Sequence, residues 1–397
     1  MRRRKRKEKK GPLWVLAATG GVLLLGLFFW ILLWPGTHHG SVPPFPSLPM
    51  PPRVPLTAED AARWMDERLD ALWHHLGVAP SRVHVEQLSS RDWEGERWEV
   101  RLTEVDLPEG VTIAKASSAI QGIPAGLDHV LAVHWALDEP GLRAADLWVN
   151  GYLTHRLFLR EGPEGAGSRP PGKGVARLAI VMDDLGNAYG PAARMLEMKV
   201  PMTLSLFPRS SQARRIAREA GSRNMELMIH LPMEPWGYPE KNPGPGALMV
   251  SMSGEELGRV LSDALKDLPQ VRGVNNHMGS RFTEDEGRMG EVMELLAARG
   301  LYFLDSLTTP RSSAFRVALR KGMQAYRRDV FLDVWKDEEK IRAQFRKLMQ
   351  VARIQGYAIG ICHPYPETLR LLPELAAMSE GKGFRWVRVS QIPAPGG

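Results

Sequence analysis

Residues 178–184 read LAIVMDD, a short apolar run that ends in the adjacent aspartates Asp183 and Asp184. Such a run is typical of a strand. From residue 175 onward, similar runs alternate with amphipathic segments of helical spacing, which predicts a parallel α/β sheet, either doubly wound or closed into a barrel. Strands are expected over residues 177–182, 202–207, 226–230, 273–277, 301–305, 326–332, 358–363 and 385–389. Helices are expected over residues 211–220, 255–268, 290–298, 340–350 and 367–378.

Polar side chains gather where these strands end. The only histidines after residue 175 all end predicted strands, and so do three aspartates: His230, His277 and His363, with Asp183, Asp184 and Asp305. In parallel α/β folds the active site forms at the carboxyl edge of the sheet. Any one of these residues alone could cap a helix or lie in a loop, but their convergence on one edge favours a functional site there.

This set of side chains suits a site for one divalent metal ion, for which zinc is the best candidate. A bound ion with an open position would polarise a carbonyl oxygen and acidify a water molecule. A second carboxylate could take the proton of that water, and a remaining histidine could protonate the leaving group, as in a hydrolase. A serine nucleophile is the competing mechanism, but the region has no Gly-x-Ser-x-Gly elbow; P-loop and Gly-x-Gly-x-x-Gly motifs are also absent.

Six stretches of this region form an ordered set of motifs: residues 180–186 (IVMDDLG), 230–235 (HLPMEP), 273–280 (GVNNHMGS), 303–306 (FLDS), 328–333 (RDVFLD) and 363–364 (HP). The set resembles the divergent polysaccharide deacetylases, a remote branch of the NodB-type carbohydrate esterases. The resemblance covers nearly all of residues 175–392. For residues 175–397 it implies a distorted (β/α) barrel of NodB type and metal-dependent removal of N- or O-acetyl groups from an acetylated glycan.

The resemblance also implies roles for particular residues. Asp183 matches the position of the catalytic base, and His363 matches the position of the general-acid histidine. The family's usual Arg-x-Pro-Tyr motif is absent, so Arg328 is the nearest candidate to orient the base. The other residues expected to bind substrate or to orient the site are Glu234, Asn275, Asn276, Ser280, Asp305 and Asp333.

One metal ligand departs from the family's pattern. Asp184 matches the metal-ligand aspartate, but typical NodB enzymes carry two metal histidines four residues apart, and here that spacing holds His230 and Glu234. The third ligand is therefore expected to be His277, with Glu234 as the alternative. A non-catalytic glycan-binding or envelope-scaffold protein on the same barrel is the competing interpretation.

The amino-terminal segment predicts a membrane anchor. Residues 1–11 form a basic tail, and residues 12–34 follow with an apolar run that would span about 33 Å as a helix, close to the ~30 Å core of a bilayer. A cleaved signal peptide is the alternative, but its apolar region would be only about 7–15 residues long. The positive-inside rule places the tail in the cytoplasm and the rest beyond the inner membrane, in the periplasm or another extracytoplasmic space.

Charge and cysteine content exclude other classes of protein. The chain has a net charge of +7, and residues 2–10 alone account for it, so the remainder is neutral and a nucleic-acid partner is not expected. Cys362 is the only cysteine in 397 residues, which excludes a disulfide framework and any site built from several cysteines.

Two linkers flank a predicted small domain. Residues 35–56 contain eight prolines, and residues 161–174 are rich in glycine and proline. Between them, residues 57–160 predict an α+β domain in the order αββαββ, with helices starting near residues 57 and 112. Its strands are expected over residues 82–88, 97–105, 129–136 and 146–159. Its histidines lack carboxylates at metal-ligand spacing, so a structural module, with an envelope protein as a candidate partner, is expected.

Overall fold

The computed structural model describes residues 57–93, 96–123, 131–139, 141–161, 175–223, 225–309 and 311–393. The predicted anchor at residues 12–34 and nearly all of the two predicted linkers lie outside these ranges. Within them, no helix combines the length and apolar character that crossing a bilayer requires.

The first part of the described chain is a five-stranded sheet with two α-helices. Its elements are α2 (Ala58–His75), η1 (Pro80–Arg82), β1 (Val83–Trp93), β2 (Glu96–Leu107), α3 (Ile113–Gln121), β3 (Leu131–Glu139), β4 (Leu142–Val149) and β5 (Tyr152–Glu161). The strand order is β1-β2-β5-β4-β3, and only β2 and β5 are parallel. Thr57 caps α2 as predicted, and α2 and α3 pack against this sheet around a core that contains Leu69, Leu72 and Leu157.

The predicted order αββαββ is wrong for this domain, which is αββαβββ. The stretch predicted as one strand over residues 146–159 is split into β4 and β5. Asn150 and Gly151 join them, with φ values of 50° and 83°. An Asn-Gly pair with positive φ at both residues is the preferred two-residue hairpin turn, so the sequence did carry the signal for this split.

The second part is a parallel sheet that confirms the predicted α/β class. Its strands are β6 (Ala176–Leu185), β7 (Thr203–Leu206), β8 (Glu226–Met233), β9 (Gly273–Met278), β10 (Tyr302–Asp305), β11 (Ala325–Arg327), β12 (Val330–Phe331), β13 (Tyr357–Cys362) and β14 (Phe384–Val387). They follow the order β11-β10-β9-β8-β7-β6-β13-β12, and β14 also pairs with β6. Among the described residues β11 and β12 do not pair, so the barrel is open between them.

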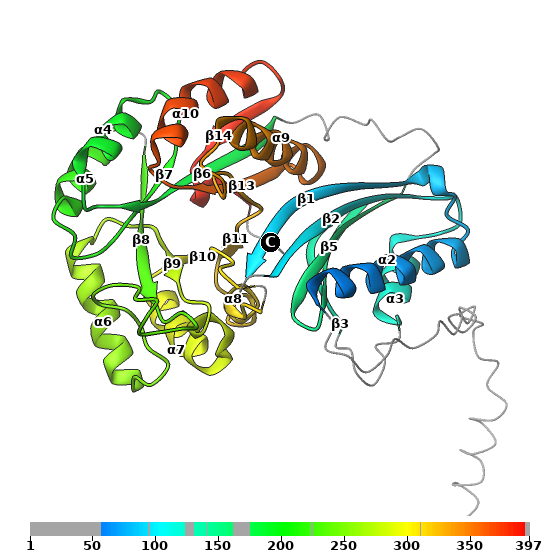
Figure 1. The fold of residues 1–397 in the computed structure, drawn as a ribbon, viewed down its shortest axis with the longest axis horizontal. Coiled ribbons are helices and arrows are strands. Elements are labelled where there is room, and N and C mark those ends of the chain that lie inside the picture. The colour runs from blue at the N-terminus through cyan, green and yellow to red at the C-terminus, as the bar shows by residue number, and fades with distance from the viewer. Residues whose placement is uncertain are drawn as a thin grey trace, which may run out of the picture. The chain divides into compact units, whose positions relative to one another are not determined.

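Helices surround this sheet (Figure 1). They are α4 (Tyr189–Glu197), α5 (Ala213–Ala220), α6 (Gly254–Asp267), α7 (Glu286–Ala297), α8 (Ala314–Arg320), α9 (Glu338–Gln355) and α10 (Pro366–Ser379), with the short turns η3 (Phe282–Glu284) and η4 (Val389–Gln391). Helices α4 and α8 are not among those predicted from the sequence. One strand was predicted over residues 326–332, but Arg328 and Asp329 separate this stretch into β11 and β12.

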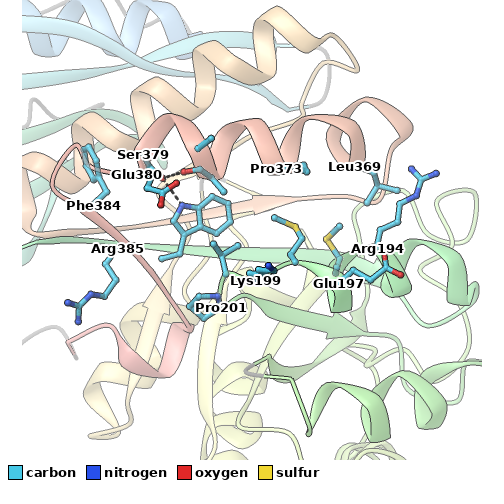
Figure 2. Close-up of a pocket in the computed structure, with 16 residues that line it drawn as sticks. Arg194, Glu197, Lys199, Pro201, Leu369, Pro373, Ser379, Glu380, Phe384 and Arg385 are labelled. Atoms are coloured by element: carbon cyan, nitrogen blue, oxygen red, sulfur yellow. Dashed lines mark hydrogen bonds between the residues drawn. The ribbon is translucent and has the colours of Figure 1, made fainter.

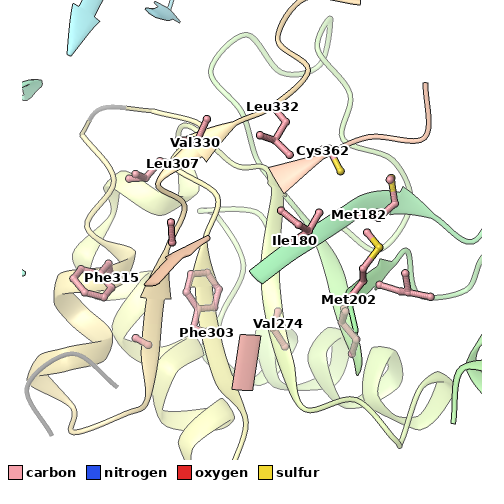
Figure 3. Packing of buried hydrophobic residues seen from close by; sticks show 14 of the residues in the cluster. Ile180, Met182, Met202, Val274, Phe303, Leu307, Phe315, Val330, Leu332 and Cys362 are labelled. Carbon is pink, nitrogen blue, oxygen red and sulfur yellow. The ribbon is translucent and has the colours of Figure 1, made fainter. Parts of the chain in front are cut away.

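Both faces of the parallel sheet are buried. Figure 3 shows the layer between strands and helices, to which Ile180, Met182 and Phe303 contribute. The opposite face has its own apolar cluster, which includes Val181 and Ile361. Strands of a parallel sheet covered on both sides read as continuous apolar runs, which explains why residues 178–184 (LAIVMDD) have no polar residue before their last two positions.

Candidate active site

The strands aim the site residues by their simple alternation. In β6, Ala179 and Val181 belong to the interior cluster, and Asp183 continues that row because residues two apart share one face of a strand. The same step leads from the interior residue Met228 to His230 in β8, and from Ile361 to His363 just beyond β13. These side chains therefore meet at the carboxyl mouth of the barrel.

Asp184 reaches the same mouth through a local change of backbone. Successive residues of a regular strand point to opposite faces, so Asp183 and Asp184 could not both face the site in an ideal strand. The pairing of β6 with β7 shifts register between Met182 and Leu185, and Asp184 adopts a φ of 57°. Aspartate is one of the few residues that tolerate this left-handed region, which suits it to this position.

Three side chains from β6, β8 and β9 bring their donor atoms together. Asp184 Oδ1 lies 3.1 Å from His230 Nε2 and 3.2 Å from His277 Nδ1, and the two nitrogens are 3.0 Å apart. Among the described residues they are the one group of histidine, cysteine and acidic side chains spaced to hold a metal ion. The predicted set of Asp184, His230 and His277 is thus brought together.

Asn275 fixes which nitrogen of His230 carries the proton. Its amide nitrogen donates to both carboxylate oxygens of Asp183, at 2.9 and 3.1 Å, so its Oδ1 is the acceptor. That oxygen accepts hydrogen bonds from Ser205 Oγ at 2.7 Å and from His230 Nδ1 at 2.9 Å. In the neutral imidazole the proton is therefore on Nδ1, and Nε2 presents its lone pair to Asp184 and His277.

The three donor atoms fit a divalent cation. Asp184 Oδ1 is buried and accepts no hydrogen bond of good geometry from the described residues, although the lone pair of His230 Nε2 faces it. Ligands about 2.0–2.2 Å from one zinc-sized ion lie roughly 3.0–3.5 Å from one another, which matches the distances in this triad. The hydrogen bond from His230 Nδ1 to Asn275 is the outer-shell contact that orients a metal-binding imidazole.

Protonation competes with a cation at this position. Burial opposes ionisation of Asp184, but the imidazoles of His230 and His277 outweigh it and hold the pKa of the carboxyl well below its usual range. Burial likewise opposes charging of His230, yet the carboxylates of Asp183 and Asp184 raise its pKa above the ordinary value. A proton on Nε2 would therefore occupy the place of the cation at lower pH.

Glu234, the alternative ligand, lies in a different set of contacts. Its Oε2 accepts a hydrogen bond from the backbone N–H of Val250 at 2.7 Å, and its Oε1 pairs with the guanidinium of Arg281. Its own backbone N–H and C=O bond to Leu248 and Phe282. Glu234 thus fastens the long loop after β8 and does not join the metal-ligand group.

His363 is backed by Asp333, as a proton-transfer residue requires. His363 Nδ1 lies 3.0 Å from Asp333 Oδ1, while Asp333 Oδ2 accepts from Thr368 Oγ1 at 2.7 Å and from the backbone N–H of His363. Burial opposes protonation of His363, but its hydrogen bond to Asp333 outweighs that effect and raises its pKa. The fixed Nδ1–H leaves Nε2 as the nitrogen available to a substrate.

The other predicted residues have structural partners around this mouth. Asn276 donates to the carbonyl of Met278 and accepts from the backbone N–H of Ser306, and Ser280 Oγ accepts from the N–H of Trp236. Asp305 is fully buried, where it accepts hydrogen bonds from Ser312 and backbone N–H groups, and burial raises its pKa. Arg328 donates to the carbonyls of Ser306 and Leu307. Asp183 accepts hydrogen bonds from the amide of Asn275, so the orienting role expected of Arg328 stays a prediction.

A cavity of about 720 Å³ opens onto these groups. Asp183, His230, His277 and His363 all line it. Six further residues lie in or beside this cavity and are not among the site residues predicted from the sequence: Ser205, Ser306, Phe207, Trp236, Lys241 and Phe331. Phe207 packs against both imidazoles of the triad, with ring centroids 5.0 Å from His230 and 4.8 Å from His277. Ser306 and Phe331 lie in the motifs at residues 303–306 and 328–333, so the sequence carried a signal for these two, whereas Ser205, Phe207, Trp236 and Lys241 become site residues only through the fold.

A larger cavity, of about 910 Å³, lies between α4, α10 and β14 (Figure 2). Leu369, Pro373 and Phe384 give it an apolar wall, and Arg194 and Arg385 are among its charged residues. Trp386 donates from Nε1 to Ser379 Oγ at 2.9 Å. Its lining includes none of the clustered aspartates and histidines, so no chemistry is assigned to it.

Comparison with known proteins agrees with this arrangement. A family model described as divergent polysaccharide deacetylase matches residues 180–392. The uncharacterised protein YibQ of Escherichia coli (strain K12) is 38% identical over 203 residues, which cover 51% of this chain and 62% of that protein. An uncharacterised protein of Haemophilus influenzae is 32% identical over 225 residues, which cover 55% of this chain and 79% of that protein.

A solved structure extends the likeness to the fold. The crystal structure of an uncharacterised protein from Agrobacterium tumefaciens C58 matches with a TM-score of 0.53 and 27% identity, over 55% of this chain and 89% of that one. The chain spans less than two thirds of the E. coli relative's length. The family model nonetheless covers more than half of the chain and most of the parallel sheet, as the sequence motifs predicted. The chain belongs to the divergent polysaccharide deacetylase family.

Proposed function

We propose that the chain is a metal-dependent hydrolase that removes acetyl groups from an envelope polysaccharide or a peptidoglycan-type glycan. One observation carries the proposal: the two histidines of the Asp184–His230–His277 triad line the same cavity as Asp183 and an Asp333-backed His363. A cation site, a separate carboxylate and an oriented imidazole are the minimum set for metal-assisted hydrolysis of an amide or ester.

The ion we assign to the triad is zinc, because two imidazoles and one carboxylate with room for a further ligand form a typical catalytic zinc set. When bound, it would act as a Lewis acid that polarises the acetyl carbonyl and lowers the pKa of a water molecule. The protein's own part is to hold the proton of neutral His230 on Nδ1 through the hydrogen bond to Asn275, so that Nε2 offers its lone pair to the ion.

Asp183 and His363 divide the proton transfers between them. Asp183 accepts a proton from the attacking water as the new C–O bond forms. His363 donates a proton from Nε2 to the amine or hydroxyl oxygen of the sugar as the C–N or C–O bond of the acetyl group breaks. Asn275 donates to both oxygens of Asp183, so an amide preorients the base.

The rim of the cavity supports a saccharide as substrate. Trp236, which lines the cavity, exposes 39% of its surface, and Tyr238, two residues further along the loop after β8, exposes 45%, although large hydrophobic side chains of the described residues are seldom exposed. Exposed aromatic rings beside a polar cavity supply flat apolar contact, which suits the apolar faces of sugar rings. Ser280 fixes the backbone of Trp236 through its hydrogen bond.

The alternative is a glycan-binding or scaffold protein without catalysis. Its support is the substitution of the usual second motif histidine by Glu234, which serves the loop after β8 instead. The two functions differ in one measurement, release of acetate by the metal-loaded protein from acetylated peptidoglycan fragments.

We further propose that residues 12–34 anchor the protein in the inner membrane, with the folded domains in the periplasm or another extracytoplasmic space. An envelope protein partner for the 57–160 domain remains a prediction. We expect the full chain to fractionate with membranes and to resist extraction by salt, because a spanning helix is held by apolar burial. Recovery in the soluble periplasmic fraction at reduced mass would show a cleaved signal peptide instead.

His277 should be required for metal binding, and Glu234 should not. We expect His277→Ala to weaken Zn²⁺ binding by at least about 100-fold, since even outer-shell partners of a metal contribute about 10–100-fold. Competition with a chromophoric chelator measures the affinity. Glu234→Gln is the matched control, because it keeps the shape of the side chain. Weakened binding in the control together with normal binding in His277→Ala would move the third ligand to Glu234.

Asp183 should be required for turnover but not for the metal. We expect Asp183→Asn to retain Zn²⁺ and to lose about 10²–10⁴-fold in kcat, the usual effect of removing a general base. Acetate release from acetylated glycan fragments and metal content are measured on the same preparation. Turnover equal to the parent's would eliminate Asp183 as the base. If the metal-loaded parent itself releases no acetate, the glycan-binding alternative replaces the hydrolase.

Asp333 should set the alkaline limit of activity. The general acid must be protonated, and Asp333 raises the pKa of His363, so activity should persist above the ordinary histidine range and fall as pH rises through that raised pKa. Asp333→Asn removes the carboxylate charge, so we expect the alkaline limb of kcat against pH to move to lower pH. A limb that does not move would assign it to a different group.

A further inference from the structure

Four buried charged residues connect the two sheets. All described residues lie in one compact unit, and Trp148 and Phe158 of the smaller sheet share a hydrophobic cluster with the parallel sheet. Within that contact, Arg156 of β5 bonds Asp146 of β4, with Nε to Oδ1 at 2.8 Å and Nη2 to Oδ2 at 3.3 Å. Arg156 also pairs with Asp329, and Asp146 pairs with Arg327.

This ion-pair network is fully desolvated. Each of Asp146, Arg156, Arg327 and Asp329 is more than nine-tenths buried. Burying charges is costly, and each becomes tolerable only when its partners stay in place, so such a network strongly favours one arrangement of its members. Asp329 is bound on its other side as well, where Oδ2 accepts from the N–H of Ile359 at 2.8 Å.

The network binds the chain at the opening of the barrel, between β11 and β12. Arg327 ends β11 and Asp329 precedes β12, strands of three and two residues that do not pair with each other in the described part of the sheet. The backbone N–H of Arg328 donates to Asp305 of β10 and that of Asp329 to Ile359 of β13, so this connection is bonded to the strands on either side of the opening while, among the described residues, β11 and β12 form no ladder with each other. The smaller sheet therefore supplies anchoring contacts where the barrel is open.

Arg328, between the two anchored residues, leads to the catalytic groups. It donates to the carbonyls of Ser306 and Leu307 at 2.8 and 3.1 Å. Ser306 Oγ in turn accepts from the amide of Asn275, which orients Asp183. On its other side the Arg328 guanidinium lies 4.8 Å from the ring of Phe331, and that ring is 4.9 Å from the imidazole of His363.

We propose that Arg156 and Asp146 are positioning residues for the active site. Through them the 57–160 domain clamps residues 327–329. Arg328 then holds Ser306, which bonds the Asn275 that orients Asp183, and Phe331, which packs against His363. The domain is then an integral part of the catalytic frame. Its effect on turnover rests on the proposed hydrolase function, whereas its effect on the order of the barrel loops does not.

The test compares variants of neighbouring residues on β5 in the full-length protein. Arg156→Met breaks the clamp, and Arg156→Lys retains one charge without the planar fork. Leu157→Ala removes a buried side chain from the small domain's own core, and Arg160→Met removes an arginine whose partner is Glu104 on the neighbouring β2. These two controls separate loss of the clamp from general destabilisation and from loss of a β5 arginine.

Two readouts are taken, hydrogen–deuterium exchange by mass spectrometry and kcat of the Zn²⁺-loaded protein. We expect Arg156→Met to raise exchange in peptides covering residues 303–309 and 327–333 and to lower kcat by about 10–100-fold, since displacements near 1 Å at a catalytic group can cost about 10²-fold. Zn²⁺ affinity should change less than kcat, because the clamp reaches the triad only through Asn275 and His230, and Asn275 is also bonded by Ser205. Arg156→Lys should recover part of both effects.

Increased exchange confined to residues 57–161 in Arg156→Met would overturn the proposal, and so would equal increases in the barrel peptides of Leu157→Ala. If Arg156→Met does not fold, Asp329→Asn takes its place, since it weakens the same pair with little change of shape; unchanged barrel exchange in that variant would equally refute the clamp. If the parent has no turnover, the exchange data still decide, so failure of the hydrolase function is distinguishable from failure of the clamp.

Discussion

The hydrogen bond between His230 Nδ1 and Asn275 Oδ1 is the interaction on which the rest of the site depends. An amide can donate only through nitrogen and accept only through oxygen, and the nitrogen of Asn275 is committed to the carboxylate of Asp183. The oxygen must then accept, which forces the proton of neutral His230 onto Nδ1. One side chain thus sets a metal-binding lone pair and a catalytic base in a fixed relation to each other.

That arrangement is available because the sheet is buried on both faces. Interior rows of side chains run along the strands and end in polar residues at the carboxyl mouth, as Val181 leads to Asp183 and Met228 to His230. In a regular strand only every second side chain points to the interior. The adjacent Asp184 therefore reaches the same site only through its left-handed backbone and the register shift in β6. The triad therefore depends on one irregular residue in an otherwise regular strand.

The sequence alone predicted the parallel sheet and the residues at its strand ends, because burial and strand alternation are local properties. It favoured His277 over Glu234 as the third ligand but could not give the physical reason, which is that Arg281 and Val250 occupy the Glu234 carboxylate. The split of residues 146–159 was missed although Asn150 and Gly151 mark the turn. Ser205 and Phe207 were beyond reach, because only packing brings them to the site.

The exchange of a motif histidine for one on the next strand alters what a bound ion would connect. Two ligands on a single segment tie the ion to one loop, but His230 and His277 belong to the paired strands β8 and β9, where Asn275 lies opposite His230. With Asp184 on β6, the ion would then link three strands of the barrel, and its binding free energy would also stabilise their carboxyl ends. At the position of the second motif histidine, Glu234 pairs with Arg281 and holds the loop that carries Trp236. The substitution thus gives this position a loop-fastening carboxylate in place of a metal-binding imidazole, while His277 keeps the number of candidate ligands the same.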